Sequence, residues 1–318
     1  MENLFKTLLR NYMKEVDGVI AATIVDRDGL IITSEDREEF DNEPIIGVLS
    51  AVLDNYIERI KDEFGTESNF YNITMTGNKK FVFCSQGPQT ILTTIADTST
   101  SDIQLRVFSE HVASKIELII AGNENVSCEI PEIIRTLSQT KDGKLPYGEF
   151  STKLILCGDY QVGKTSLIRR FVENTFKKNY ISTIGVEISK KDLEIQENTN
   201  LNFIIWDIGG QISQMTPYRK RFYSGANAAF IVVDRTRANN ENSVDFWYHE
   251  IKESVPNNIP VVIVGNKSDL VDNIVVSEEV IKEKANRHGF HYILTSAKTG
   301  ENVHDAFLYI AYRFLDNV

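Results

Sequence analysis

The chain has 318 residues, 42% of them hydrophobic and 25% charged, which is typical of a soluble globular protein with about two domains. Its 7 proline and 18 glycine residues exclude a collagen-like or broadly disordered chain. The net charge of −11 argues against nonspecific attraction to nucleic acid or anionic membranes, so we expect no nucleic-acid partner.

The acidic charge is concentrated at the start of the chain. Residues 1–125 contain 11 Lys and Arg against 21 Asp and Glu, a net charge of −10, whereas residues 151–318 contain 20 of each kind. We therefore predict an N-terminal domain at 1–125, a linker at 126–150 and a C-terminal domain at 151–318. Within the linker, residues 131–137 predict a short helix with Pro131 in its first turn.

The N-terminal domain alternates between helical and strand-like patterns. Apolar residues at helical spacing predict helices near 4–13, 44–60 and 101–121. Runs typical of strands lie at 18–25, 30–33, 71–76, 80–85 and 90–96. The predicted order is α-β-β-α-β-β-β-α, which makes this an α+β domain.

Few polar residues of the N-terminal domain are candidates for a catalytic or metal-binding site. Asp26 and Asp28 lie in a turn between the first two predicted strands, and turn formation explains them better than a cation site does. His111 lies on a predicted helix without a partner at metal-ligand spacing, so we interpret it as structural or exposed. We find no catalytic constellation in this domain.

The strongest motif of the C-terminal domain has the form GxxxxGK[ST]. It follows a strand-like run at 154–157 and precedes a helix-like segment at 166–172, the context that a phosphate-binding loop requires. In such a loop, backbone amides converge on phosphate oxygens, Lys164 meets the β- and γ-phosphates, and the Thr165 hydroxyl binds Mg²⁺. The expected phosphate-binding residues are Gly158, Asp159, Tyr160, Gln161, Val162, Gly163, Lys164, Thr165 and Ser166.

A second motif selects the base. The strand-like run at 261–265 ends in Asn266-Lys267-Ser268-Asp269, an NKxD pattern. The Asp269 carboxylate can accept two hydrogen bonds from guanine, whereas adenine lacks that pair of donors. We expect Asn266 and Lys267 to brace this loop against the phosphate-binding loop. The backbone at Ser296, Ala297 and Lys298, after another apolar run, could reach the guanine oxygen.

Together these motifs resemble the nucleotide-binding motifs of the Ras-superfamily small GTPases over about 151–318. Some of them are similar to Rab motifs and others to Arf motifs. The resemblance implies a P-loop GTPase fold with a mostly parallel sheet flanked by helices. It also implies Mg²⁺ with GTP or GDP as ligand, and catalytic roles for Lys164, Thr183 and Gln211. By the same resemblance, Phe176 packs beside the guanine, and Thr165 and Thr183 bind Mg²⁺ directly while Asp207 binds it through water. The Gly210 amide binds the γ-phosphate, and Gln211 positions the attacking water.

One residue departs from the family pattern. Tyr160 occupies a position where the family usually has a small residue, often glycine. A phenol there would crowd the γ-phosphate region and the space for an arginine finger, which is worth about 10³–10⁵ in rate. We therefore predict intrinsic hydrolysis on the order of 10⁻⁴ s⁻¹ or slower. The opposite effect, a hydroxyl that shields the site and positions water, stays open.

The N-terminal element order and the turn at 25–31 resemble the Roadblock (dynein light-chain) family over about 1–122, and the whole chain resembles archaeal Roadblock–GTPase fusions. That resemblance implies dimerisation through edge strands and helices, and regulation of a small GTPase. We expect a homodimeric GTPase switch that acts in signalling, with effectors and regulators not identified by the sequence. The alternative is a nearly inert GTP-binding scaffold; a P-loop ATPase fits Asp269 poorly.

We expect a cytoplasmic protein. The three cysteines form neither a disulfide framework nor a CxxC pattern, and the first residues lack the layout of a secretory signal. No apolar run approaches the ~20 residues of a membrane span. The last residues contain no cysteine for prenylation and the second residue is Glu2 rather than glycine, so we expect no direct lipid anchor.

Overall fold

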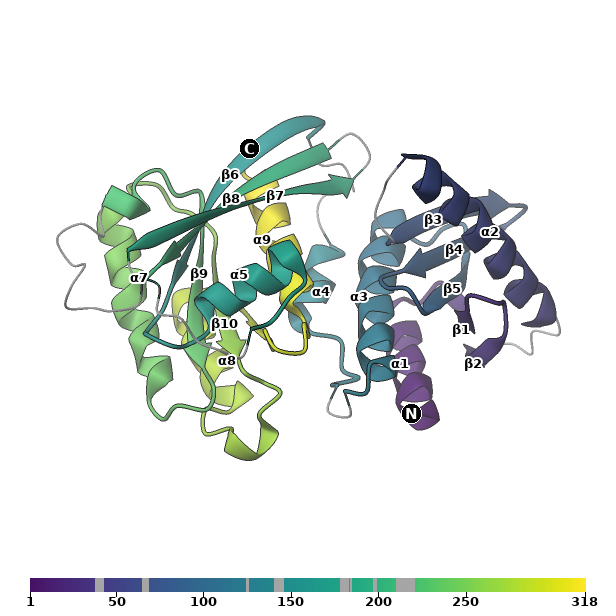
Figure 1. Cartoon of the computed structure of the whole chain (residues 1–318), viewed down its shortest axis with the longest axis horizontal. Helices are drawn as coiled ribbons and strands as arrows, with labels where there is room; N and C mark the ends of the chain where they lie inside the picture. Colours follow the sequence, from purple (N-terminus) through teal and green to yellow (C-terminus); the bar gives the residue numbers. More distant parts are fainter. Residues whose placement is uncertain are drawn as a thin grey trace. The chain divides into compact units, whose positions relative to one another are not determined.

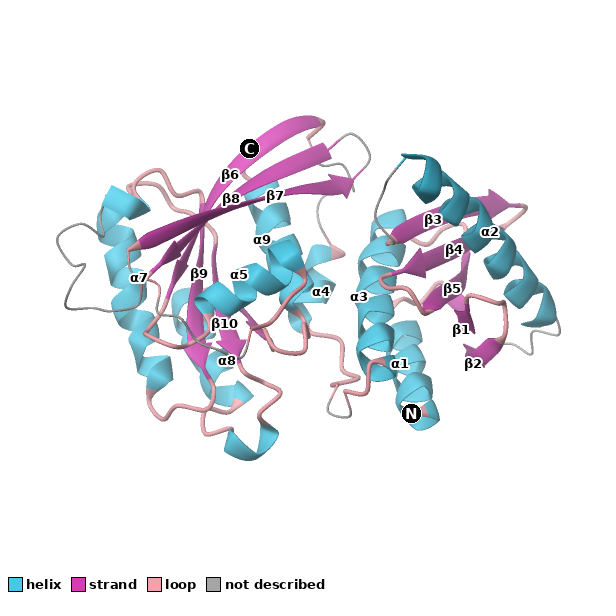
Figure 2. Ribbon diagram, viewed as in Figure 1, coloured by secondary structure: helices cyan, strands magenta, loops and turns pink. Residues whose placement is uncertain are grey.

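The computed structural model describes residues 1–37, 43–64, 69–123, 126–139, 146–177, 183, 185–196, 199–209 and 221–318. These residues belong to two compact units, Met1–Gly143 and Lys144–Val318. Each unit combines one sheet with helices, so the architecture is mixed α/β (Figure 2). No helix in the described part of the chain is both long and apolar enough to cross a membrane.

The first unit contains a five-stranded antiparallel sheet in the order β2-β1-β5-β4-β3. Helices α1 and α3 cover one face of this sheet and α2 covers the other (Figure 1). The elements follow in the order that the sequence predicts, with ends that differ by a few residues. Their bounds are α1 Glu2–Glu15, β1 Val19–Asp26, β2 Ile31–Asp36, α2 Glu43–Phe64, β3 Phe70–Thr76, β4 Lys79–Ser85, β5 Thr90–Asp97 and α3 Asp102–Ile120.

Local chemistry explains the ends of several of these elements. In the turn between β1 and β2, the Asp26 carboxylate accepts hydrogen bonds from the amides of Asp28 and Leu30, at 3.0 and 2.8 Å. Asp26 is therefore a turn-forming residue, as expected. Helix α3 begins where the Ser101 hydroxyl accepts from an amide of its first turn. His111 on α3 is buried, which makes it structural rather than exposed.

Residues 126–139 belong to the first unit, although we expected them to form the start of a linker. The short helix α4, Glu132–Leu137, buries Ile133, Ile134 and Leu137. Its Arg135 forms two hydrogen bonds with the Glu15 carboxylate of α1, at 2.7 and 2.8 Å. The segment before α4 is held by Lys115 of α3, whose ammonium donates to the carbonyls of two of its residues. Pro131 precedes α4 as its N-cap instead of lying in its first turn.

The second unit contains a six-stranded sheet in the order β11-β10-β9-β6-β8-β7. All neighbouring strands are parallel except β7, which runs antiparallel to β8. The first strand begins at Gly148, three residues before the expected boundary at 151. The bounds are β6 Gly148–Cys157, α5 Lys164–Glu173, β7 Val186–Gln196, β8 Thr199–Ile208, β9 Ala228–Asp234, η2 Asn240–Asn242, α7 Ser243–Ser254, β10 Val261–Asn266, η3 Val271–Asn273, α8 Glu278–His288, β11 His291–Leu294 and α9 Val303–Leu315.

The core of the second unit lies on both faces of its sheet. Strands β9 and β10 are buried along their whole length, as parallel central strands require. On one side, Trp247 of α7 is packed among aliphatic side chains of these strands. On the other, Phe307 of α9 stacks on Phe171 of α5 with ring centroids 3.9 Å apart. The carboxyl ends of β6, β8, β9 and β10 consequently meet at one edge of the sheet.

Candidate functional site

The loop between β6 and α5 has a backbone that only certain residues allow. Gly158 and Gly163 have φ angles of 142° and 101°. A Cβ atom at Gly163 would lie 2.3 Å from the Asn266 side-chain nitrogen, and one at Gly158 would lie 2.5 Å from the Val232 carbonyl oxygen. Both glycines of the motif are therefore required by close packing, and the loop leads directly into the N-terminus of α5.

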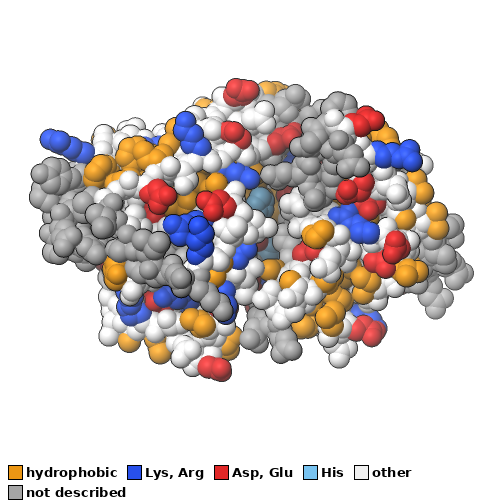
Figure 3. Space-filling model, viewed as in Figure 1, with side chains coloured by type: hydrophobic (Ala, Val, Ile, Leu, Met, Phe, Trp, Pro, Cys, Tyr) orange, Lys and Arg blue, Asp and Glu red, His pale blue; other side chains and the backbone are white. Residues whose placement is uncertain are grey.

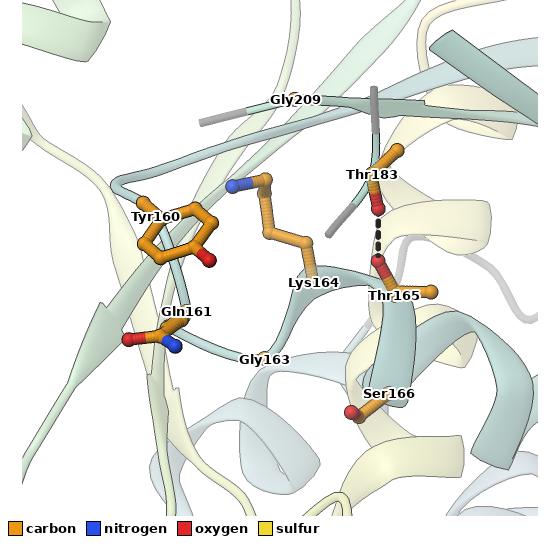
Figure 4. Close-up of a pocket in the computed structure, with 8 residues that line it drawn as sticks. All are labelled: Tyr160, Gln161, Gly163, Lys164, Thr165, Ser166, Thr183 and Gly209. Carbon is orange, nitrogen blue, oxygen red and sulfur yellow. Dashed lines mark hydrogen bonds between the residues drawn. The ribbon is translucent and has the colours of Figure 1, made fainter. Parts of the chain in front are cut away.

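A pocket at this N-terminus is lined by residues from three segments of the chain (Figure 4). Lys164 is only 6% exposed, and its ammonium donates to the carbonyls of Gly158 and Asp159 at 2.7 and 2.9 Å. Thr183 and Gly209 come from the segments before β7 and after β8. The lining residues are Tyr160, Gln161, Gly163, Lys164, Thr165, Ser166, Thr183 and Gly209.

Three side-chain oxygens converge at one side of this pocket. The hydroxyl oxygens of Thr165 and Thr183 are 2.8 Å apart, and the dashed line in Figure 4 marks the hydrogen bond between them. Both hydroxyls also donate to Oδ2 of Asp207 at the end of β8, the Thr183 contact being 3.3 Å long. The expected Mg²⁺ ligands thus lie together although they come from distant parts of the sequence.

The Asp207 carboxylate suits a cation. It is 2% exposed, and its Oδ1 atom is buried without a hydrogen-bond partner among the described residues. Burial raises the pKa of Asp207, although the two threonine hydroxyls and Lys164 oppose that rise. A buried carboxylate oxygen without a protein partner, beside two hydroxyls, fits a hard divalent ion such as Mg²⁺.

Tyr160 forms one wall of the pocket. Its ring lies across Lys164 from the Thr165–Thr183 pair (Figure 4). Its backbone is fixed from outside, because Arg237 donates to the Tyr160 carbonyl oxygen at 2.8 Å. The neighbouring Asp159 does not line the pocket: its carboxylate accepts from the indole of Trp247 and the amide of Asn240, at 2.9 and 2.6 Å.

The NKxD segment lies at the carboxyl end of β10. Asn266 donates to the Val162 carbonyl of the phosphate-binding loop at 2.9 Å and accepts from the Ala297 amide at 3.1 Å. Asp269 accepts from the Ser296 hydroxyl at 2.7 Å, and its other oxygen is 3.5 Å from the Lys298 ammonium. The structure therefore brings both predicted base-binding segments together and links them to the phosphate-binding loop through Asn266.

Lys267 differs from our expectation. Its ammonium binds Asp234 at the end of β9, at 2.6 Å, rather than the phosphate-binding loop. Asp234 is 2% exposed, so a full countercharge is needed there. Arg170 of α5 also holds the base-binding region, through the carbonyls of Ala297 and Lys298 at 3.1 and 2.5 Å.

Sequence reasoning missed Asp234, Arg170 and Arg237. For Asp234 a signal exists, since it directly follows a continuous apolar run and so ends a strand at the edge where the motifs meet. Arg170 and Arg237 lie on a helix and in a loop without a motif of their own. Only the folded arrangement shows which carbonyls they reach.

Some predicted residues lie outside the described part of the chain. Gly210 and Gln211 are among these, so the structure says nothing of their positions. Phe176, which follows α5, is described and half-buried. Among the described residues, no group of three or more His, Cys, Asp or Glu is placed to hold a metal ion.

Comparison with known proteins gives a consistent result. Residues 153–316 match the Ras family. The "GTP-binding protein YPTM2" of Zea mays is 36% identical over 173 residues, 54% of this chain and 84% of that protein. The "GTP-binding protein ypt1" of Schizosaccharomyces pombe is 38% identical over 163 residues, which are 51% of this chain and 79% of that protein. "Ras-related protein Rab-1" of Theileria annulata is 36% identical over 171 residues, which are 54% of this chain and 77% of that protein. With half of its length matched and these motifs in place, the chain belongs to the Ras family of small GTPases.

Proposed function

We propose that this chain is a guanine-nucleotide switch that binds GTP and GDP with Mg²⁺ and hydrolyses GTP slowly. The observation that carries the proposal is the convergence of Thr165, Thr183 and Asp207 beside Lys164 at the N-terminus of α5. Family membership supports GTPase activity in general. For the base, support comes from the Asp269 carboxylate, held by Ser296 and linked through its loop to the phosphate end.

The protein groups around the pocket suit phosphoryl transfer, which needs charge neutralisation and an oriented nucleophile. Lys164 and the loop amides would bind the phosphates, while Thr165, Thr183 and Asp207 would hold Mg²⁺, which neutralises charge on the transferred group. Gln211 would orient the attacking water by the family match. Because Tyr160 borders the same space, we propose that it slows hydrolysis and restricts an activating arginine from another protein.

A second candidate is a GTP-loaded scaffold that hardly turns over, and Tyr160 is the observation in its favour. Single-turnover hydrolysis by the GTP-loaded full chain, with and without Mg²⁺, separates the two. The switch predicts Mg²⁺-dependent phosphate release on the order of 10⁻⁴ s⁻¹ or slower. Tight GTP binding without any phosphate release over days would support the scaffold and contradict the switch. Failure to bind GTP would contradict both functions.

We propose that the N-terminal unit is a Roadblock-like domain that joins two copies of the chain in the cytoplasm. Support comes first from α2, which exposes apolar residues along one side while its opposite side packs on the sheet. Their exposed fractions range from 37% to 64%, for Val48, Leu49, Val52, Tyr56 and Ile60. Such a row is too apolar for a helix whose outer face meets only water.

One edge of the sheet in this unit supports the same proposal. Strand β3 is an edge strand whose outer hydrogen-bonding groups face no other strand among the residues that the structure describes, and its Met75 is 62% exposed. Figure 3 shows apolar side chains, in orange, exposed beside acidic ones on this unit. Strand pairing and helix packing across a two-fold axis would cover the edge and the apolar row together.

The dimer is tested by light scattering on the full chain. Val52→Glu and Tyr56→Glu should each shift the mass from two chains toward one, because a carboxylate would be buried in the interface. Thr7→Glu, at an exposed site on α1, adds the same charge and should leave the mass unchanged. A monomeric wild-type chain at micromolar concentration would contradict the proposal.

A further inference from the structure

The second unit has another pocket at the opposite end of β10 from the NKxD motif. Its volume is about 580 Å³, within the roughly 300–1,000 Å³ typical of small-molecule sites. The walls come from the end of α7, the segment at 256–260, the starts of β10 and β11 and the last turns of α9. Because Val261 begins β10 here and Asn266 ends it at the other site, the two pockets are separated by the length of the strand.

Aromatic rings form much of this pocket's wall. Tyr248 and Phe290 make an edge-to-face contact with centroids 4.8 Å apart. His291 and Tyr309 make another such contact at 4.9 Å. Tyr248, Phe290 and His291 are partly exposed, so their rings offer flat surface to a ligand, whereas Tyr309 is buried and supports His291 through their contact.

The charges in the pocket are all of one kind. Lys252 and Arg313 line it, and none of its sixteen described lining residues is acidic. Within the described part of the chain, neither Lys252 nor Arg313 has a carboxylate within 4.0 Å, in contrast to many other basic residues of the protein. Three asparagines, Asn257, Asn258 and Asn317, also line the wall, and the Asn317 amide donates to the Arg313 carbonyl at 2.7 Å.

Tyr309 contributes a buried polar group to this wall. The residue is 1% exposed, yet its hydroxyl has no hydrogen-bond partner among the described residues. Burial raises the pKa of this phenol, and Arg313, four residues further along α9, opposes the rise. A buried hydroxyl without a partner costs stability unless something else satisfies it.

We propose that this pocket binds a small aromatic carboxylate. Its ring would pack against the aromatic wall, and its carboxylate would be held by Arg313 and Lys252, since a guanidinium matches the two carboxylate oxygens. A pocket of this volume accommodates one or two fused rings. The site is independent of the nucleotide pocket and goes beyond the proposed switch function.

The test uses the full chain loaded with GDP and Mg²⁺, so that the nucleotide pocket is filled, and naphthalene-2-carboxylate as the probe. Calorimetric titration should give a dissociation constant of about 1 mM, as expected for a modest ligand of this size. The uncharged naphthalene-2-carboxamide should bind at least about tenfold more weakly. Arg313→Gln and Lys252→Gln should each weaken carboxylate binding by a similar factor.

The matched control is Lys282→Gln, which removes a positive charge from an exposed position on α8 outside the pocket and should leave binding unchanged. Unaltered GDP affinity in each variant shows that the domain is folded. Equal binding of carboxylate and carboxamide, equal binding by wild type and Arg313→Gln, or no binding at all would overturn the proposal. Tighter binding of 2-naphthyl phosphate than of the carboxylate would overturn the assignment of ligand class.

Discussion

At the level of single residues, Tyr160 has the clearest testable effect. Its ring borders the pocket beside Lys164, where the γ-phosphate and attacking water are expected. We predict that Tyr160→Gly accelerates single-turnover GTP hydrolysis by about tenfold or more, which corresponds to about 1.4 kcal/mol of barrier. Gln161→Gly, at the next lining position, should change the rate much less. An unchanged or slower rate for Tyr160→Gly would show that the phenol does not obstruct catalysis.

Asp207 gives a second prediction at this scale. Asp207→Asn removes the buried carboxylate that accepts from Thr165 and Thr183, so Mg²⁺ affinity should fall by about 100-fold or more. Affinity for nucleotide measured in excess chelator should stay within a few-fold of wild type. Titrating Mg²⁺ against GDP release measures both, with Asp192→Asn on β7 as a control. Wild-type Mg²⁺ dependence in Asp207→Asn would contradict the assignment.

Asp234 predicts a pH dependence. Burial favours a higher pKa, but hydrogen bonds from Lys267 and Thr236 outweigh it and lower the pKa below the ordinary 3.8. The folded state thus binds the proton less readily than the unfolded state. The ion pair's stabilisation is present above pH 3.8 and is lost as the pH falls through the folded-state pKa.

Urea unfolding of the C-terminal unit within the full chain checks this. Asp234→Asn should lower the free energy of unfolding at pH 7 by about 1–3 kcal/mol, and the difference from wild type should shrink below about pH 4. Asp272→Asn, at an exposed carboxylate nearby, is the control. A difference that is the same at pH 7 and pH 3.5 would contradict the ion pair.

The residues of the candidate site differ in how far sequence could place them. Lys164 and Asp269 lie in motifs whose spacing implies their chemistry. The grouping of Thr183 with Asp207 came from family resemblance, because nothing local to either residue brings them together. The partner of Lys267 was unpredictable, since it depends on which strand lies beside β10 in the sheet.

At the level of elements, α4 was predicted as a helix, but it belongs to the first unit instead of a linker. We predict that Ile134→Ala lowers the stability of the first unit by about 2–4 kcal/mol, because Ile134 is 0% exposed. Leu30→Ala, at a position that is 67% exposed, should cost well under 1 kcal/mol. Denaturant unfolding of the full chain measures both. A loss below about 1 kcal/mol for Ile134→Ala would show that α4 is only loosely attached.

Most elements were predictable because their patterns are local. The amphipathic spacing of α1 and the alternation of strands and turns at 70–97 depend only on neighbouring residues. The attachment of 126–139 was not predictable in this way. It rests partly on Glu15, which is 120 residues from its partner Arg135, and the charged and turn-forming residues of the segment resemble those of a linker.

At the level of the whole molecule, the proposed dimer gives a prediction about regulation. If pairing of the N-terminal units influences the GTPase, Val52→Glu should change the rates of GDP release or GTP hydrolysis by several-fold in the full chain. Thr7→Glu should leave both rates as in wild type. Identical rates in a monomeric Val52→Glu variant would mean that dimerisation brings chains together without regulating the nucleotide site.

The proposed switch requires the nucleotide site to bind guanine nucleotides in preference to adenine nucleotides. Calorimetric titration of the nucleotide-stripped full chain with GDP and with ADP, in the presence of Mg²⁺, measures this preference. We predict that GDP binds at least about 10³-fold more tightly than ADP, because Asp269 finds its hydrogen-bond donors only on guanine. Equal affinity for the two nucleotides, or binding of neither, would show that the site is not a guanine-nucleotide site.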